Sequence, residues 1–406
     1  MIKLPIEIVQ LLWSCGNNKV EHLNGYDKEF SEATFDIVST SPFVIQTNSA
    51  SILLTRDEND PNIETYQYVV LTNKRPRKSE FLKGNILSIR WIKHPKFTTL
   101  HPNEITASWR GKFLYKKEDV QNSIFGLRAP QLGAIYAFMS KAQIHHGRNI
   151  IVMPTGTGKT ETMLSILVAN QCAKVLITVP SDALREQLSN KFITLGILPQ
   201  YGIVADDCSY PNVGVVKEGM DYNGWHSLIE ESNVIITTMP LITNCEPAII
   251  DLLKEKISHL FVDEAHHSEA KTWSDFIDSF DDEKVTLFTA TPFRNDNRRL
   301  RGEFIYNFSL KDAQSQGYYK PINFIPIREY DLIQADQHIA EVAVNQLRSD
   351  MENGYDHILM ARCSTKQRAK EVMEIYQQYS DLNPVMVFSS MSNQKAILND
   401  IKAKKA

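Results

Sequence analysis

The sequence predicts an α/β protein in which a parallel sheet follows a smaller β-rich region. From about residue 124 onward, short apolar runs alternate with amphipathic stretches of helical length, as in parallel strands connected by helices. Several of these runs end in polar residues and tight turns, at the edge where open α/β sheets bind ligands. Before residue 120, the apolar runs are short and separated by turn residues.

Composition narrows the class of protein. The chain has 406 residues, of which 43% are hydrophobic, enough for two or three domains with their own cores. Its net charge of −4 excludes a global basic field, so any contact with nucleic acid must come from a local groove. The five cysteines form no C-x-x-C pair, and no apolar run approaches the ~20 residues that span a bilayer. We therefore expect a cytoplasmic protein with reduced thiols and no membrane partner.

The first region, residues 1–120, is expected to form a β-rich accessory domain. Residues 6–13 predict a short helix, and the β-rich runs that follow lie at 34–38, 43–46, 51–55, 66–72 and 85–92. The basic run at 74–78 either contacts a nucleic-acid backbone or is simply solvated, and solvation is the more common case. We find no catalytic motif in this region.

A phosphate-binding loop is predicted between a strand at 149–153 and a helix at 161–171. The loop consists of Pro154, Thr155, Gly156, Thr157, Gly158, Lys159 and Thr160. Backbone N–H groups and the positive end of the helix would face the phosphates of a nucleoside triphosphate. Lys159 would reach the β- and γ-phosphates, and the Thr160 hydroxyl would bind Mg²⁺.

Two carboxylates follow the predicted buried strand at 257–262. Asp263 would hold Mg²⁺, usually through water, and Glu264 would orient and deprotonate the attacking water. Gln131 precedes the phosphate loop and could pair with an adenine edge, although a helix N-terminus explains its Arg-x-Pro-Gln context equally well.

Hydroxyl-bearing strand ends predict contacts with a nucleic-acid backbone. The residues expected to make them follow or end the strands at 175–179 and 234–238: Pro180, Ser181, Thr237 and Thr238. The strand at 285–289 ends at Thr289, and Thr291 follows it two residues later; both could sense the state of the nucleotide. Arg294, in a cluster of arginines, either contacts phosphate or pairs with nearby acids in a solvated loop.

Taken together, these motifs resemble superfamily 2 helicases and translocases of the DEAH type, and most of all their restriction-enzyme branch. That branch includes the motor subunits of type I and type III restriction enzymes and related phage-defence helicases. The resemblance covers roughly residues 124–390. The motifs that carry it are Gln131, PTGTGKT at 154–160, TVPSDALREQ at 178–187, TTMP at 237–240, DEAHHSEAKTW at 263–273 and TATPFRND at 289–296.

The resemblance implies two RecA-like domains, an ATP-binding one at 121–318 and a partial one at 319–406, with ATP and Mg²⁺ between them. It also implies that His266, Thr289 and Thr291 couple hydrolysis to movement, and that Ser364 contacts nucleic acid. The expected partner is single- or double-stranded DNA rather than RNA. A nuclease or defence-system protein is a further candidate partner.

The sequence departs from this family where motifs V and VI would follow. Motif VI supplies arginine fingers, and loss of such a finger costs about 10³ to 10⁵ in rate. We therefore expect either a fragment of a longer motor or a truncated product that binds ATP and hydrolyses it poorly. Three functions stay open: a DNA helicase or translocase, a nucleotide-binding module that acts through protein partners, and an RNA helicase.

Overall fold

The computed structural model describes residues 10–15, 19–24, 35–72, 75, 77–81, 89–94, 100–141, 144, 147–267, 271–291, 300–320, 323–388, 391 and 394–402. The chain divides into two compact units, Met1–Lys320 and Pro321–Ala406. The first unit contains a 14-stranded sheet. None of the helices in the described ranges combines the length and the apolar character needed to cross a membrane.

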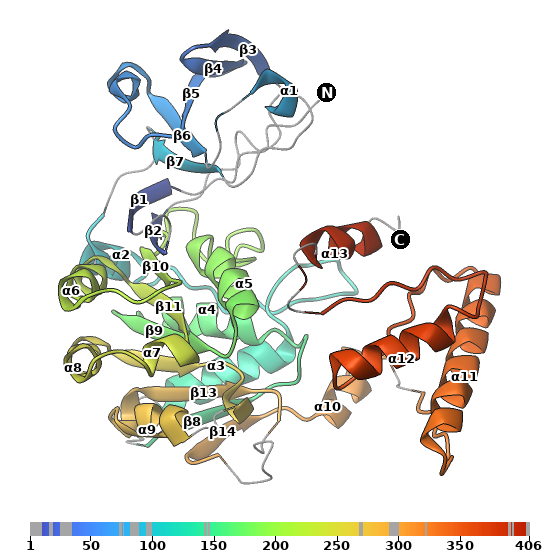
Figure 1. Ribbon diagram of the computed structural model, residues 1–406. Helices are drawn as coiled ribbons and strands as arrows, with labels where there is room; N and C mark the ends of the chain where they lie inside the picture. Colours follow the sequence, from blue (N-terminus) through green and yellow to red (C-terminus); the bar gives the residue numbers. More distant parts are fainter. Residues whose placement is uncertain are drawn as a thin grey trace. The chain divides into compact units, whose positions relative to one another are not determined.

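Parallel strands make up one part of this sheet (Figure 1). Their spatial order is β14 (Glu303–Asn307), β8 (Asn149–Val152), β13 (Val285–Thr289), β12 (His259–Val262), β9 (Val175–Val179), β11 (Val234–Thr238) and β10 (Val213–Val216). Every residue of β8, β9, β10, β11 and β13 is buried. Such continuous apolar runs are typical of parallel strands covered on both faces.

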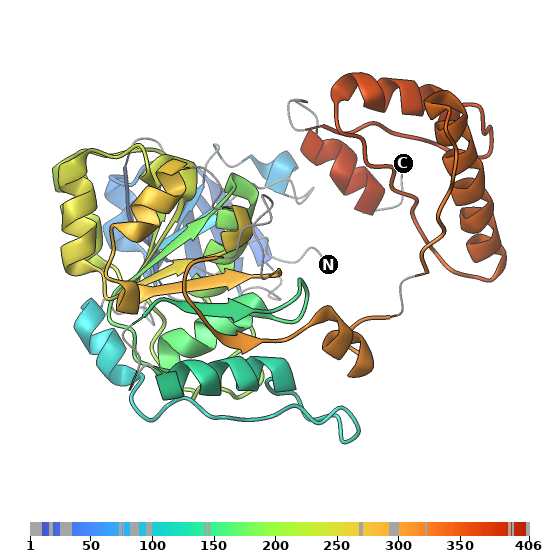
Figure 2. The same cartoon turned by 90° about the horizontal axis from the view of Figure 1, so that it is seen from below.

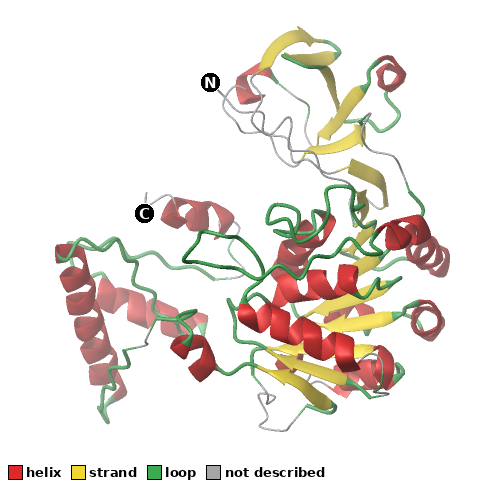
Figure 3. Ribbon diagram, turned by 180° about the vertical axis from the view of Figure 1, so that it is seen from behind, coloured by secondary structure: helices red, strands yellow, loops and turns green. Residues whose placement is uncertain are grey.

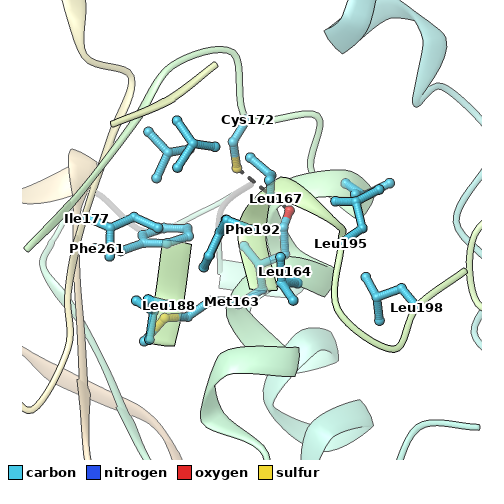
Figure 4. Packing of buried hydrophobic residues seen from close by; sticks show 14 of the residues in the cluster. Met163, Leu164, Leu167, Cys172, Ile177, Leu188, Phe192, Leu195, Leu198 and Phe261 are labelled. Atoms are coloured by element: carbon cyan, nitrogen blue, oxygen red, sulfur yellow. Dashed lines mark hydrogen bonds between the residues drawn. The ribbon is translucent and has the colours of Figure 1, made fainter. Parts of the chain in front are cut away.

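Helices cover both faces of the parallel part, as Figures 2 and 3 show. One face is covered by α3 (Ala129–Lys141), α4 (Lys159–Ala169) and α5 (Asp182–Ile193), whose buried residues share one core. The other is covered by α6 (Tyr222–Glu231), α7 (Met239–Ile242), α8 (Pro247–Lys256) and α9 (Lys271–Asp278), which share a second core. Figure 4 shows Met163 and Phe192, from α4 and α5, packing near Ile177 and Phe261 of the sheet.

The N-terminal strands extend the same sheet beyond β10. β2 (Val20–Asn24) pairs antiparallel with β10. The order continues as β1 (Gln10–Cys15), β7 (Ile89–Lys93), β6 (Tyr68–Thr72), β5 (Ser51–Thr55), β4 (Phe43–Thr47) and β3 (Phe35–Thr40). A separate apolar core lies here, including Ile45, Ile52 and Trp91. Short helices, η1 (Pro61–Thr65), α1 (Lys78–Phe81) and α2 (Pro102–Ser108), complete this region.

The structure confirms the predicted fold class: α/β, with a large, mostly parallel sheet preceded by a β-rich region. Some elements differ from the prediction. The helix expected at 6–13 is wrong where the structure describes it, because Gln10–Cys15 is strand β1, held between β2 and β7. The apolar run at 202–205 also predicts a strand, but in the structure it makes only an isolated bridge from Val204 to Phe113. The sequence analysis did not predict β2 or β14, both of which are defined by pairing with distant strands.

The second unit contains α11 (Leu332–Glu352), α12 (Lys366–Tyr376) and α13 (Gln394–Lys402). Ala340 and Val344 of α11 pack against Tyr376 of α12 in a small core. The apolar runs at 357–360 and 385–388 predict two strands in this region, but both segments are irregular in the structure. A strand is stable only when it pairs with a neighbour, and these segments have no strand partner among the described residues of this unit.

Candidate functional site

The predicted phosphate loop is a tight turn between β8 and α4. Gly156 and Gly158 have φ angles of 84° and 97°, a region that residues with a side chain rarely adopt. The Thr157 N–H donates to Pro154 O (3.2 Å), and its buried hydroxyl donates to the same carbonyl (2.6 Å). No described side chain caps the first turn of α4. The N–H groups of this turn are therefore available for an anion.

Lys159 lies between the two predicted carboxylates. Its Nζ is 2.5 Å from Glu264 Oε1 and 3.8 Å from Asp263 Oδ1. The side chains of Lys159 and Asp263 are only 9% and 6% exposed, so these charges interact in a largely dehydrated environment. Burial raises the pKa of Asp263 above its usual value, and the Lys159 ammonium opposes that shift. The residues predicted to bind phosphate and metal thus form one buried ion-pair cluster.

Asp263 is suited to hold a divalent cation. Its buried Oδ1 has no hydrogen-bond partner among the residues that the structure describes. A carboxylate oxygen is the ligand that Mg²⁺ prefers, and Mg²⁺ is usually held by one or two protein groups together with substrate phosphates. Thr160, in the first turn of α4, offers a half-buried hydroxyl. In the described residues, no group of three or more His, Cys, Asp or Glu side chains could hold a metal ion.

His266 connects the carboxylates to the neighbouring strand. Its Nδ1 is 3.3 Å from Glu264 Oε2 and 3.1 Å from Thr289 Oγ1 at the end of β13. The Thr289 hydroxyl donates to Thr291 O (2.8 Å). Glu264 has a φ of 50°, an unusual conformation for a residue with a side chain. The structure therefore brings together His266, Thr289 and Thr291, the residues predicted to couple hydrolysis to movement.

Gln131, predicted either to pair with an adenine edge or to mark a helix N-terminus, lies in the first turn of α3. Its side chain is 3% exposed. Its Oε1 accepts from the Arg128 N–H (2.7 Å), and its Nε2 lies 3.4 Å from Gly158 O. A Cβ at Gly158 would collide with this amide, so Gln131 packs directly on the phosphate loop. An adenine contact would require Gln131 to leave these partners.

The residues of the first unit that are predicted to contact nucleic acid differ in their exposure to solvent. Ser181 is exposed and Pro180 half-buried, at the end of β9, the edge of the sheet that also carries the phosphate loop. Thr237 is fully buried and Thr238 is 6% exposed. The Thr237 hydroxyl has no hydrogen-bond partner in the described part of the chain.

Two further predicted contacts cannot be placed at this site. Arg294 lies outside the described residues. Ser364 is exposed but belongs to the unit at 321–406. The sequence analysis also missed Arg128 and Tyr319, which contact or approach the phosphate loop. Arg128 stands three residues before Gln131, but nothing in the local sequence around Tyr319 indicates a role at this loop.

A family model described as "Type III restriction enzyme, res subunit" matches residues 124–294. No curated protein sequence matches the chain significantly. Solved structures with similarity include the Pyrococcus furiosus Hef helicase domain, at 21% identity and TM-score 0.33, covering 61% of this chain and 53% of that one.

Bacteriophage T4 UvsW is 12% identical, with a TM-score of 0.34, and the match covers 76% of this chain and 60% of that one. The Type ISP restriction-modification enzyme LlaGI, in a nuclease-deletion form with a DNA substrate mimic, is 18% identical with a TM-score of 0.34. That match covers 70% of this chain and 30% of LlaGI. The chain thus spans less than two thirds of the length of each of these proteins.

Proposed function

We propose that this chain, whose residues 124–294 belong to the restriction-enzyme branch of superfamily 2 helicases, is an ATP-driven motor that acts on DNA. The observation that carries the proposal is the contact of Lys159, in the phosphate loop, with the carboxylates of Glu264 and Asp263. A lysine, a metal-binding carboxylate and a second carboxylate next to an uncapped helix N-terminus are the parts that nucleotide hydrolysis requires.

In the proposed reaction, the phosphates of ATP compete with Glu264 for the Lys159 ammonium. Lys159 moves from the carboxylate to the β- and γ-phosphates, as lysines of phosphate loops do. Glu264 is then free to orient the attacking water and to accept its proton. Asp263 and Thr160 would hold Mg²⁺, which neutralises charge on the phosphates. The 2.5 Å ion pair between Lys159 and Glu264 is the contact that the phosphates would replace.

His266 is proposed to report this change to the rest of the motor. Because its Nδ1 lies near both Glu264 and Thr289, movement of Glu264 alters the hydrogen bonding of the Thr289 hydroxyl. Thr289 also binds the Thr291 carbonyl, immediately before residues 292–299. The chain after Thr289 is thereby connected to the nucleotide. Pro180, Ser181, Thr237, Thr238, Arg294 and Ser364 stay the proposed nucleic-acid contacts.

DNA is the proposed track, with RNA as the alternative, since both classes of motor share the core motifs. A second alternative is a nucleotide-binding module that works through protein partners, including a nuclease or defence-system protein. The cytoplasm is the proposed location.

The test is ATP hydrolysis by the purified chain, measured alone and with single-stranded DNA, duplex DNA or RNA at one stated salt concentration. Stimulation by either DNA, but not by RNA, supports the DNA motor. Stimulation by RNA alone would contradict the DNA motor and support an RNA helicase. ATP binding without turnover on any nucleic acid supports the binding module. Absence of ATP binding, measured by calorimetry, would refute all three.

A further inference from the structure

Arg128 holds one peptide of the phosphate loop in place. Its Nη1 donates to Gly156 O (2.9 Å). The N–H of the same peptide, on Thr157, donates to Pro154 O (3.2 Å). Because a peptide unit is planar, holding its carbonyl and its N–H fixes its orientation. Gly156 is also one of the two loop residues at positive φ, where the backbone is most free to change conformation.

Arg128 is itself held by an aromatic ring from far along the chain. Its guanidinium carbon lies 5.6 Å from the centroid of the Tyr318 ring, within the range of a cation–π contact. The Tyr318 hydroxyl donates to Glu118 Oε1 (3.3 Å). The Glu118 N–H in turn donates to Leu127 O (2.9 Å), which places Glu118 beside the Arg128 segment. A continuous set of contacts thus runs from Glu118 through Tyr318 and Arg128 to Gly156.

The backbone after β14 is shaped to deliver Tyr318 to this position. Phe308 N–H donates to Val152 O (2.9 Å), so the segment begins at the strand that leads into the phosphate loop. α10 (Leu310–Ser315) follows, with a capping box formed by Ser309 and Asp312. It ends in a Schellman motif: Gly317 has a φ of 78°, and the Tyr318 N–H donates to Ala313 O (2.9 Å). Local sequence therefore fixes the turn that presents Tyr318.

Tyr319 approaches the loop directly. A Cβ built on Gly156 would lie 3.3 Å from the Tyr319 hydroxyl oxygen. The next residues, Lys320 and Pro321, mark the boundary between the two compact units of the chain. The backbone that continues into the second unit thus leaves the first unit at the phosphate loop.

We propose that Arg128 and Tyr318 are positioning residues of the phosphate loop, and that the segment 308–319 is a functional part of the nucleotide site. This inference rests on the proposed nucleotide binding for its purpose, but its structural content does not. Tyr318 fixes the guanidinium, the guanidinium fixes the Gly156 peptide, and the loop is held ready to receive phosphates.

The first test uses the full, nucleotide-free chain and measures hydrogen–deuterium exchange of the amides at 155–158. Arg128→Leu and Tyr318→Leu should speed this exchange by about 10-fold, the factor for losing one charge-assisted hydrogen bond. Tyr318→Phe keeps the ring beneath Arg128 and should stay within about twofold of the parent protein. Unchanged exchange in Arg128→Leu or Tyr318→Leu would overturn the inference.

Amides of α8, on the opposite face of the sheet, serve as an internal control for folding. If Tyr318→Leu does not fold, Arg128→Lys gives the same information, because it keeps the charge but loses the planar group that spans Tyr318 and Gly156. Faster loop exchange in Arg128→Lys supports the positioning role. Parent-like exchange contradicts it.

The second test compares Mg–ATP with inorganic tripolyphosphate as ligands in calorimetry. If the pair positions the loop, Tyr318→Leu weakens both ligands by the same factor, about 10-fold, because both bind through phosphates. Weaker ATP binding with unchanged tripolyphosphate binding would mean that Tyr318 acts on the base instead. Failure of the parent protein to bind either ligand would refute the proposed function, whereas the exchange measurement would still decide the role of Arg128 and Tyr318.

Discussion

The two parts of the sheet in the first unit differ in how their strands pair, and this difference explains where the site lies. From β14 to β10 all strands are parallel, so their carboxyl ends meet at one edge. That edge collects Lys159, Asp263 and Thr289, which lie far apart in the sequence. In the N-terminal part, antiparallel pairs such as β3–β4 and β4–β5 send successive strand ends to opposite edges. Its buried core, which includes Ile45, Ile52 and Trp91, is apolar.

The two parts meet in a buried polar network. Asn212, before β10, is 2% exposed and donates to Leu100 O and Glu231 O, each at 3.1 Å. Its Oδ1 accepts from Asn24 at the end of β2. Asn233 donates to Pro102 O (2.8 Å). The N-terminal strands thus cover the β10 edge and are fixed to the parallel part by satisfied, buried hydrogen bonds.

The largest expected effect is on ATP turnover, which should depend on the parallel part of the sheet and not on the N-terminal part. Lys159→Ala removes the charge that faces the phosphates and should lower ATP turnover by about 10²–10³-fold or more. Lys93→Ala, in the N-terminal part, removes a lysine that donates to Ile63 O (3.1 Å) and should leave turnover unchanged. Steady-state hydrolysis assays of both variants make the comparison. Equal losses in the two variants would contradict the assignment of chemistry to the parallel edge.

The second largest effect is on the free energy of unfolding, and it tests the hydrogen-bond network around Asn212 that joins the two parts of the sheet. Asn212→Ala leaves the carbonyls of Leu100 and Glu231 and the Asn24 amide without this partner, and should lower the free energy of unfolding by about 2–4 kcal/mol. Urea denaturation followed by circular dichroism measures this change. The matched control is Asn244→Ala, which removes an exposed amide that donates to Pro240 O; its expected effect is within about 0.5 kcal/mol. If the two variants unfold alike, the junction network does not fix the parts together.

The smallest expected effect is on the way the stability of the fold changes with pH. His259, on β12, is half-buried, and desolvation of its ring lowers its pKa from 6.5 to about 4. Below pH 6.5 the unfolded chain binds a proton that the folded protein does not, so stability falls as the pH drops from 6.5 towards 4. His259→Asn should remove roughly 1–2 kcal/mol of this loss at pH 5. Denaturation midpoints at pH 5 and pH 7 provide the measurement. The exposed His226, replaced by Asn, should leave the pH dependence as it was, and an equal change there would contradict the account.

The sequence predicted the parts of the site that are contiguous in the chain. The phosphate loop, Asp263–Glu264 and Thr289 each follow a buried strand directly, and parallel pairing then brings those strand ends together. The family match at 124–294 covers all of them. The β-rich character of the N-terminal region was also predictable, because β-branched runs and turn residues are local features.

The parts that the sequence did not predict depend on long-range contacts. β2 is a strand because β10 lies beside it, and β14 because β8 does, at separations that no local pattern encodes. Gln131 was expected either to pair with an adenine edge or to mark a helix N-terminus, and only the folded chain shows its amide in contact with Arg128 and the phosphate loop. Tyr318 reaches Arg128 across 190 residues of sequence, and only the folded backbone shows the contact.

The most direct test of the central claim, that Glu264 acts on water once nucleotide has displaced Lys159, is the substitution Glu264→Gln. The variant loses the proton acceptor and also the negative partner of Lys159. We therefore expect it to bind Mg–ATP at least as tightly as the parent chain, while its single-turnover hydrolysis rate falls by about 10²–10⁴-fold. Calorimetry and quench-flow on the same preparation give both values. Parent-like hydrolysis by Glu264→Gln, or loss of ATP binding with the fold intact, would contradict the account.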